Sequence, residues 1–500
     1  MEFRLALFFL SFYYLRPQDW VPGLAGLNLV EPIIGTWIIV LLVYRSQASP
    51  LPGLLRTPHD WLMLTYFVYI MWTTPDWNYA FSDILSLTVF YALTVQSLTS
   101  WSRIYEFLRW WNAMILAVAT IALLSLIGID PTGAVELTQS KAGRLSIGTW
   151  LHNNPNALGH TVVAVLPLSY LLFFWKGTVS GRFLIFPICF FLAGATAWQT
   201  ESKGAFLVGA GTILLLFVIG RHRIVQISTI VIALTVGISG LSFLPRMEHM
   251  GDIQSDEGVI GRVMAWEMAR TATREYPTGV GYRQFKALID WVDGTRVYHD
   301  IPKATHCSYV SIGADLGGYG LFIYLALLWV SFRSVLFLKT GSDLEERCRR
   351  AILILLAANV VSGWMINRGY HTEYFLLIAV AGAVHRLRVA EYLAKKTEEE
   401  NVEETDAGPE WLGAPVGGLA VAGSTGQGGV ALPPSAFSVS PLLDRQEPHR
   451  AFRGQAKRTR RSKSEPLKAP WNRLGLIDIG VTMALTWLVF TIWDYVITMI

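Results

Sequence analysis

One histidine stands where a polar stretch gives way to a long apolar run. Residues 303–320 read KATHCSYVSIGADLGGYG, and His306 lies at the transition. Ser308 or Thr305 is of a type that caps a helix start, and the positive end of such a helix disfavours a protonated imidazole. A neutral imidazole can act as a general base. A lone histidine at a helix start is more often structural, so the surrounding residues must decide between the two interpretations.

A second group of side chains is suited to phosphate. Within residues 259–285, four side chains recur at intervals of four and share one side of a predicted helix: Arg262, Trp266, Arg270 and Arg274. The other side is apolar, which is typical of a helix lying on a membrane surface. Arginine binds two phosphate oxygens with its planar fork. Attraction to lipid headgroups is the alternative for Arg270 and Arg274.

Two turns carry further cations. KAGRLSIGTWLHNNPNALGH, residues 141–160, places Arg144 before an Asn-Pro turn signal, with Asn156 as a helix cap. QTESKGAFLVGAG places Lys203 at the start of an apolar segment. Each segment can be explained as an ordinary polar turn. Each could also bind an anion, because the N-terminus of a helix attracts negative charge.

These cations have no matching cluster of carboxylates, so they do not resemble a magnesium or manganese site. They fit a site that holds a diphosphate with Arg and Lys and removes a proton with His306. Such cations would stabilise the charge that builds on a leaving diphosphate. In this setting the catalytic interpretation of His306 becomes the better one. We expect no metal and no cofactor.

Composition places these residues in a membrane protein. Of 500 residues, 52% are hydrophobic and 16% charged, whereas about 25% are charged in soluble proteins. The apolar runs are continuous, which predicts helices and an all-α polytopic fold with 12–13 spans. The net charge is only +4, so no nucleic-acid partner is predicted. The three cysteines show no paired spacing, so neither a disulfide framework nor a zinc site is predicted. The predicted spans lie near residues 3–16, 29–44, 60–75, 79–98, 107–129, 157–175, 183–200, 204–220, 224–244, 308–338, 351–367, 372–390 and 475–498.

Basic residues predict the orientation. Lys and Arg are richest in the loops that follow the second, sixth, eighth, tenth and twelfth segments, which the positive-inside rule places in the cytoplasm. The N-terminus is then cytoplasmic, and a large loop near 245–307, between spans 9 and 10, is periplasmic. Residues 391–473 are rich in Gly, Pro, Ser and charge, which predicts a disordered cytoplasmic tail. Residues 474–500 form an extra transmembrane helix.

At these residues the sequence resembles the bacterial O-antigen ligase and O-antigen polymerase superfamily, which includes the pilin O-oligosaccharyltransferases. The resemblance covers about residues 1–390, the membrane-embedded domain. It rests on the order of the Arg144 segment with NNPN, ESKGA, the GR at Arg262, PTGVGY and THCSYVSIGADLGGYGL, with the long loop between the ninth and tenth spans.

The resemblance implies an inverting, metal-independent glycosyltransferase of the bacterial inner membrane. Its donor is a glycan on undecaprenyl diphosphate, and its acceptor is a lipid A core, a growing glycan or a protein. Arg144 and Arg262 would hold the diphosphate, and His306 would help to activate the acceptor hydroxyl. Together with the residue types, this gives a catalytic pair of His306 and Arg262. Lys203 and Arg270 add to the diphosphate-binding set.

Three residues depart from the family pattern. Lys203 falls where many members have Arg, which keeps the charge but loses the fork. Cys307 replaces a common Asn, and Asp315 replaces a frequent Glu. The tail and the last span lie outside the resemblance.

Two other functions compete with transfer. A lipid-linked sugar flippase predicts similar halves and charges inside spans, whereas here the halves differ and the polar groups gather at one face. A non-catalytic component of a polysaccharide export complex is the third possibility, with the tail as its contact. Ligase and polymerase are not separated by the sequence.

Overall fold

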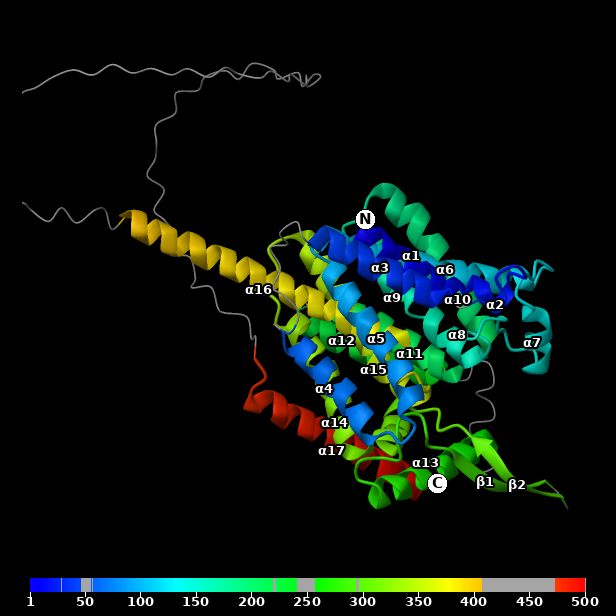
Figure 1. Ribbon diagram of the computed structural model, residues 1–500. Helices are drawn as coiled ribbons and strands as arrows, with labels where there is room; N and C mark the ends of the chain where they lie inside the picture. Colours follow the sequence, from blue (N-terminus) through cyan, green and yellow to red (C-terminus); the bar gives the residue numbers. More distant parts are fainter. Residues whose placement is uncertain are drawn as a thin grey trace, which may run out of the picture. The chain divides into compact units, whose positions relative to one another are not determined.

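The protein is mostly helical in the computed structural model, which describes residues 1–27, 29–45, 55, 57–218, 222–240, 257–293, 296–406 and 473–499 (Figure 1). Met1–Tyr392 and Ala469–Ile500 form one compact unit, and Leu393–Lys468 form another. In chain order the elements are α1 (Glu2–Leu15), α2 (Pro17–Trp20), α3 (Val30–Arg45), α4 (Pro58–Thr73), α5 (Trp77–Ser97), α6 (Trp101–Ser125), α7 (Ala134–Ser140), α8 (Pro155–Val162), α9 (Val165–Ser169), η1 (Tyr170–Phe174), η2 (Gly181–Ile185), α10 (Phe186–Thr200), α11 (Lys203–Val218), α12 (Arg223–Gly240), α13 (Glu257–Glu275), β1 (Ala287–Asp293), β2 (Arg296–Lys303), α14 (Ser308–Leu336), α15 (Asp343–Met365), α16 (Thr372–Asp406) and α17 (Leu476–Met499).

Every one of the predicted apolar segments coincides with a helix or with adjoining helices. The sixth is divided into α8, α9 and η1, with a turn at Val163 and Ala164. Pro167 accounts for the division, because proline has no N–H to donate and its ring clashes with the carbonyl four residues earlier. That carbonyl belongs to Val163, where α8 ends. A continuous apolar run therefore predicted the helix but not its break.

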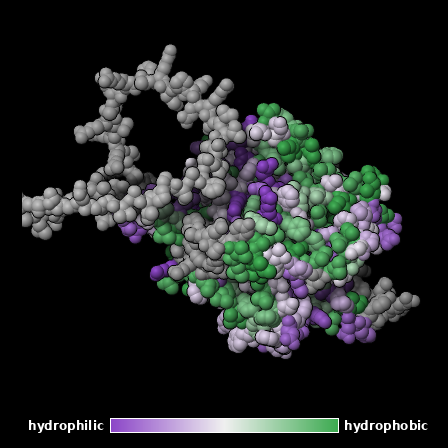
Figure 2. Space-filling model, turned by 45° about the horizontal axis from the view of Figure 1, so that its top comes forward, coloured by the Kyte–Doolittle hydropathy of each residue, from purple (hydrophilic) through white to green (hydrophobic). Residues whose placement is uncertain are grey.

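Six helical segments within the described ranges are long and apolar enough to cross a membrane. They are Trp101–Ser125, Pro155–Phe174, Gly181–Thr200, Ser308–Leu336, Asp343–Met365 and Leu476–Met499. Large apolar side chains such as Trp72, Phe183 and Trp487 point outward from the helices, and Figure 2 shows broad hydrophobic areas on the face in view. The chain is thus a multi-pass membrane protein. The count of 12–13 spans, the cytoplasmic N-terminus and the periplasmic loop stay predictions.

Helix α14 lies at the centre of the part that carries the site. It packs against α4, α13, α15 and α17 (Figure 1). Most of its side chains are buried, including Tyr309, Ile312 and Leu316. A hydrophobic cluster joins these residues to the buried side chains of α4, α5, α13, α16 and α17. The start of α14 is therefore packed among helices from several parts of the chain.

The segment expected as a large loop contains regular structure. Helix α13 covers the predicted helical stretch, and β1 pairs with β2 as an antiparallel hairpin in which Ala287 faces Lys303. The hairpin is the exception to the all-α prediction. An Asp-Gly pair at residues 293–294, flanked by β-prone residues, is the signal that could have predicted it.

Residues 391–406 continue α16 as a helix, although disorder was expected from residue 391. The segment is rich in Glu and contains two Lys, residues that favour helix, and Lys396 pairs with Glu400 one turn later at 3.5 Å. Most of the predicted tail lies outside the described residues.

Candidate functional site

The start of α14 is held by groups from another loop and not by its own cap. Cys307 is the N-cap residue and makes no side-chain cap hydrogen bond, so the expected capping by Ser308 or Thr305 is wrong. The Ser308 hydroxyl instead donates to the Ile366 carbonyl at 2.9 Å and accepts from the Arg368 backbone N–H at 2.8 Å. The connection between α15 and α16 is thereby bound to the first turn of α14.

His306 is a neutral imidazole at physiological pH. Burial, and then the positive charge of Arg262, lower the pKa of His306 to about 4. This direction agrees with the prediction of a neutral histidine, but its largest cause is burial and not the end of the helix. The His306 backbone has a φ of 49°, a region that non-glycine residues rarely adopt. Beside it, burial raises the pKa of the Cys307 thiol to about 12, so the thiol also stays neutral.

Helix α13 is joined to the segment that carries His306. The charge of Arg262 acts on His306 and also on His160 of α8. One turn further along α13, the Trp266 indole N–H donates to the Thr305 carbonyl at 2.7 Å. This bond fixes α13 to the residue immediately before His306, so the positions of Arg262 and His306 depend on each other.

The ESKGA turn packs against the same part of the molecule. A methyl group added at Gly204 would lie 2.9 Å from Nε2 of His160, so this approach needs glycine. The neighbouring Lys203 side chain makes no hydrogen bond or ion pair within the described part of the chain. His160 thus contacts the backbone of this turn at Gly204 and also feels the charge of Arg262.

Arg144, in the segment between α7 and α8, contacts the end of α10, next to this turn. Its Nε donates to the Thr200 carbonyl at 3.1 Å, and its Nη2 donates to Oδ1 of Asn156 at 2.7 Å. The cap of α8 is Asn154, whose side chain accepts the Asn156 N–H at 2.9 Å, so the prediction of Asn156 as the cap is wrong. Arg144 thus ties the NNPN segment to the ESKGA turn.

Arg270 is not part of this group. Its guanidinium makes two hydrogen bonds to the Asp494 carboxylate of α17, at 2.6 and 2.8 Å. The structure therefore brings together the regions of Arg144, Lys203, Arg262 and His306, and it gives Arg270 a partner elsewhere. The phosphate-binding and catalytic roles of all five residues stay predictions.

A glycine-dependent break in α14 sets the position of the loop after α13. Gly317 has φ 65° and ψ −172°, and a methyl group there would lie 2.0 Å from the Pro277 carbonyl oxygen. The break frees carbonyl groups of α14. The Ala314 carbonyl accepts the Val280 N–H at 3.2 Å, and the Asp315 carbonyl accepts the Gly281 N–H at 2.7 Å. PTGVGY is therefore docked on α14 through its backbone.

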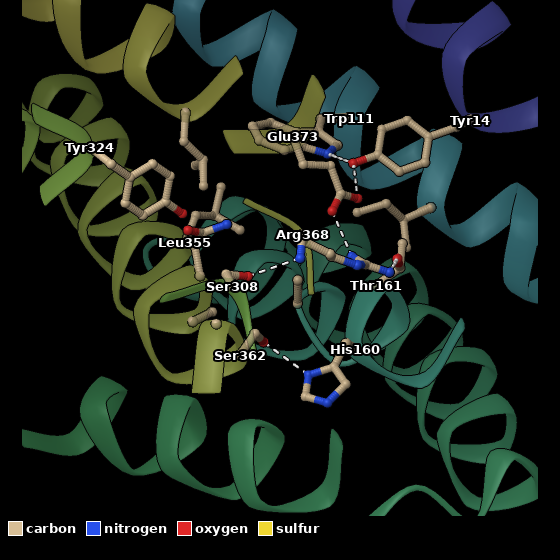
Figure 3. Close-up of a pocket in the computed structure, with 16 residues that line it drawn as sticks. Tyr14, Trp111, His160, Thr161, Ser308, Tyr324, Leu355, Ser362, Arg368 and Glu373 are labelled. Atoms are coloured by element: carbon tan, nitrogen blue, oxygen red, sulfur yellow. Dashed lines mark hydrogen bonds and ion pairs between the residues drawn. The ribbon is translucent and has the colours of Figure 1, made fainter. Parts of the chain in front are cut away.

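A buried polar network lies beneath the site and was missed in the sequence. Arg368 Nη1 donates to Glu373 at 2.6 Å, and the Tyr14 hydroxyl donates to the same carboxylate at 2.9 Å. His160 Nδ1 lies 2.9 Å from the Ser362 hydroxyl. Figure 3 shows Glu373 between Tyr14 and Arg368, around a cavity of about 50 Å³. The signals that could have revealed it were the His160 that follows NNPN and the polar run between the eleventh and twelfth segments.

Two larger pockets share part of their lining, and the smaller of them reaches α14. They measure about 330 and 280 Å³ and have four lining residues in common: Trp150, Arg283, Tyr370 and His371. The Trp150 ring stacks on His371 with centroids 5.7 Å apart. Burial, followed by the charges of Arg368 and Arg283, lowers the pKa of His371 to about 3. These pockets thus combine exposed aromatic surface with a cation and a neutral imidazole.

The smaller of these pockets extends to α14, where Ser311 and Asp315 line it. These residues follow His306 by about one and two helical turns. Within the described ranges, no three His, Cys, Asp or Glu side chains gather as metal ligands would, and metal independence stays a prediction.

The helices define a multi-pass membrane protein. Residues 188–325 match the family model described as O-antigen ligase. The match spans the ESKGA turn, α13 and the start of α14, and it confirms the resemblance to the O-antigen ligase superfamily that the motifs predicted. No curated protein matches the chain. Helices α15–α17 lie outside the matched residues.

Proposed function

We propose that the protein transfers a glycan from undecaprenyl diphosphate to an acceptor hydroxyl at the periplasmic face of the bacterial inner membrane. The observation that supports this most directly is a neutral His306 beside Arg262 at the start of α14, inside the residues that match the O-antigen ligase family. A neutral imidazole can accept a proton, and an arginine next to it can bind a phosphate without needing a metal.

In the proposed reaction, His306 removes the proton from the acceptor hydroxyl. The acceptor oxygen then forms a bond to the anomeric carbon, and the bond from that carbon to the diphosphate oxygen breaks. The electron pair leaves with the polyprenyl diphosphate, whose developing charge is stabilised by Arg262 and Lys203. Attack opposite the leaving group inverts the anomeric centre. Arg144 holds the adjoining turns in place and adds positive charge.

The adjoining pockets supply a place for the sugar of the acceptor. Aromatic rings such as Trp150 and Tyr370 can stack on the apolar face of a pyranose, while Arg283 and Asp315 can bind its hydroxyls. Each pocket is near the lower end of the size range for ligand sites. Ser311 and Asp315 line the smaller pocket from the first three turns of α14, the helix that follows His306.

The test is to replace His306 and Arg262 with alanine in the source bacterium and to separate surface glycan and the lipid-linked pool on gels. His299→Ala is the matched control, because this histidine lies in the same loop and is exposed. Both site variants should lose transfer by about 100-fold or more at normal protein levels, which is the usual range for a general base. Normal surface glycan from both variants would exclude the proposed reaction.

The same gels separate the finer possibilities. Loss of long chains with single repeats still attached to the acceptor indicates a polymerase. Long chains that stay on the lipid carrier indicate a ligase. Accumulation of lipid-linked units on the inner leaflet would favour a flippase instead.

A further inference from the structure

We infer that α17, which lies outside the matched family residues, is a positioning element that holds α13 against α14 and thereby fixes Arg262 relative to His306. The inference rests on the proposed function for its consequence in catalysis. Its structural basis is independent of that function, because it consists of contacts that α17 makes at both ends of α14 and with α13.

One end of α17 is bound to the far end of α14. The Asp478 carboxylate lies 3.1 Å from Arg333 of α14, and both side chains are almost fully buried. The Trp329 indole N–H also donates to Asp478, at 2.9 Å. A buried ion pair with additional hydrogen bonds is costly to break, because separation leaves an uncompensated charge. Helix α17 is therefore held along α14 in a defined register, antiparallel to it.

The other end of α17 reaches the site through a series of tryptophans. Trp493 is fully buried and its ring packs on Gly313, where an added methyl group would lie 2.9 Å from it. The Trp493 indole N–H donates to the Trp266 carbonyl at 3.0 Å. The Trp266 indole N–H in turn donates to the carbonyl of Thr305 at 2.7 Å. Two hydrogen bonds thus lead from α17, through α13, to the residue before His306.

An ion pair holds α13 against α17 a second time. Arg270 makes its two-pronged contact with Asp494, and its guanidinium lies over the Phe490 ring at 4.6 Å. The Arg270 side chain is 18% exposed. A bidentate arginine over an aromatic ring has its direction fixed as well as its position. Because Arg262 is on the same helix, α17 determines where Arg262 can lie.

The first test exchanges the two charges. Arg270→Asp and Asp494→Arg should each lower the rate of glycan transfer about 10- to 100-fold, as expected for a small misplacement of catalytic groups. The double variant should recover most of the rate. Trp487→Ala is the control, because Trp487 is a tryptophan of α17 that points away from the protein, and it should leave the rate unchanged. Protein levels are measured for each variant.

The second test does not depend on catalysis. Purified protein is labelled with diethyl pyrocarbonate from pH 4 to pH 8, and modification of His306 is followed by mass spectrometry. If α17 holds the site closed, Asp494→Arg and Gly313→Val should shift the apparent pKa of His306 from about 4 towards its ordinary value of 6.5, because the imidazole gains water. The double charge exchange should reverse the shift.

The outcomes separate this inference from the proposed function. Unchanged transfer and unchanged labelling in Asp494→Arg, at normal protein levels, would overturn the inference. An equal loss of transfer in the single variants and in the double exchange would also overturn it. If His306→Ala transfers glycan normally, the proposed function fails, and the labelling result alone then decides whether α17 positions this loop.

Discussion

His306 has its proton affinity set by its surroundings. The side chain is largely buried and lies beside a permanent cation, and both effects disfavour the charged imidazole. The usual pKa of histidine is near 6.5, so an imidazole with that pKa would be partly protonated at mildly acidic pH. The lowered pKa would keep His306 available as the proposed base at such a pH.

The pH dependence of transfer follows from this value. Since the pKa of His306 is lowered to about 4, the imidazole gains its proton only as the pH falls through that value. Transfer is expected to stay level from about pH 8 to pH 5 and to fall below that range, with its midpoint near pH 4. Rates measured in membranes with donor extracted from the source cell check this. A midpoint near 6.5 would mean that His306 is solvated or is not the base, and His299→Ala should leave the profile unchanged.

The cation at position 203 offers a second test at the scale of one residue. Lys203 provides a charge without the planar fork of arginine, and it makes no hydrogen bond or ion pair within the described ranges. We expect Lys203→Arg to keep or raise the transfer rate and Lys203→Ala to lower it about tenfold or more, because the leaving diphosphate loses a compensating charge.

The measurement is the initial rate at saturating acceptor, with the donor concentration varied. Lys286→Ala is the control, because this lysine lies in the same loop as α13 and is exposed. Equal rates for wild-type protein and Lys203→Ala would remove Lys203 from the site.

At the scale of elements, the break in α14 depends on one glycine. Gly317 has a positive φ, and the Pro277 carbonyl oxygen occupies the space of a side chain. Gly317→Ala should therefore displace the PTGVGY turn and lower the free energy of unfolding by about 2–4 kcal/mol. Gly318→Ala is the matched control, since an added methyl group there meets Phe490 only at 3.8 Å.

Thermal unfolding in detergent, followed by tryptophan fluorescence, compares these two variants. Gly318→Ala should melt close to the wild-type temperature. If Gly317→Ala melts there as well, the loop is not docked on α14 through this break.

The helices were predictable from sequence because each is a local apolar run, and membrane spans need no knowledge of distant residues. The breaks at Pro167 and Gly317 were not predicted, although both residues are visible in the sequence. The buried polar residues His160, Arg368 and Glu373 could not be predicted as a group, because their hydrogen-bond partners include residues far away in the sequence. The same holds for Arg270, whose partner Asp494 belongs to the last helix.

For the candidate site, the sequence identified the positively charged residues, but it did not show which of them lie near His306 and which are paired elsewhere. Arg262 and Arg270 have the same type and lie on the same face of one helix, yet only Arg262 acts on His306. Arg270 is instead paired with Asp494 of α17. The neutral state of His306 was predicted, whereas burial as its main cause required the packed structure.

For the whole molecule, the predicted topology can be checked by labelling from outside the cell. The prediction places His299 in the periplasm and Gly341 in the cytoplasm. His299→Cys should react with a membrane-impermeant maleimide in intact spheroplasts, because this position is exposed. Gly341→Cys should react only after the membrane is opened. The three native cysteines are buried, so their background labelling should be low. The reverse pattern would place the site on the cytoplasmic face.

The packing of α17 on α14 also has a consequence for the time at which a newly made chain becomes active. A ribosome adds about 5–20 residues per second, so the last helix emerges roughly ten to thirty seconds after α14 has been made. Until then α13 would lack the element that we infer aligns it, and the new chain would be inactive. Activity would then require that α17 has been made, and a chain truncated before residue 473 would be inserted but inactive.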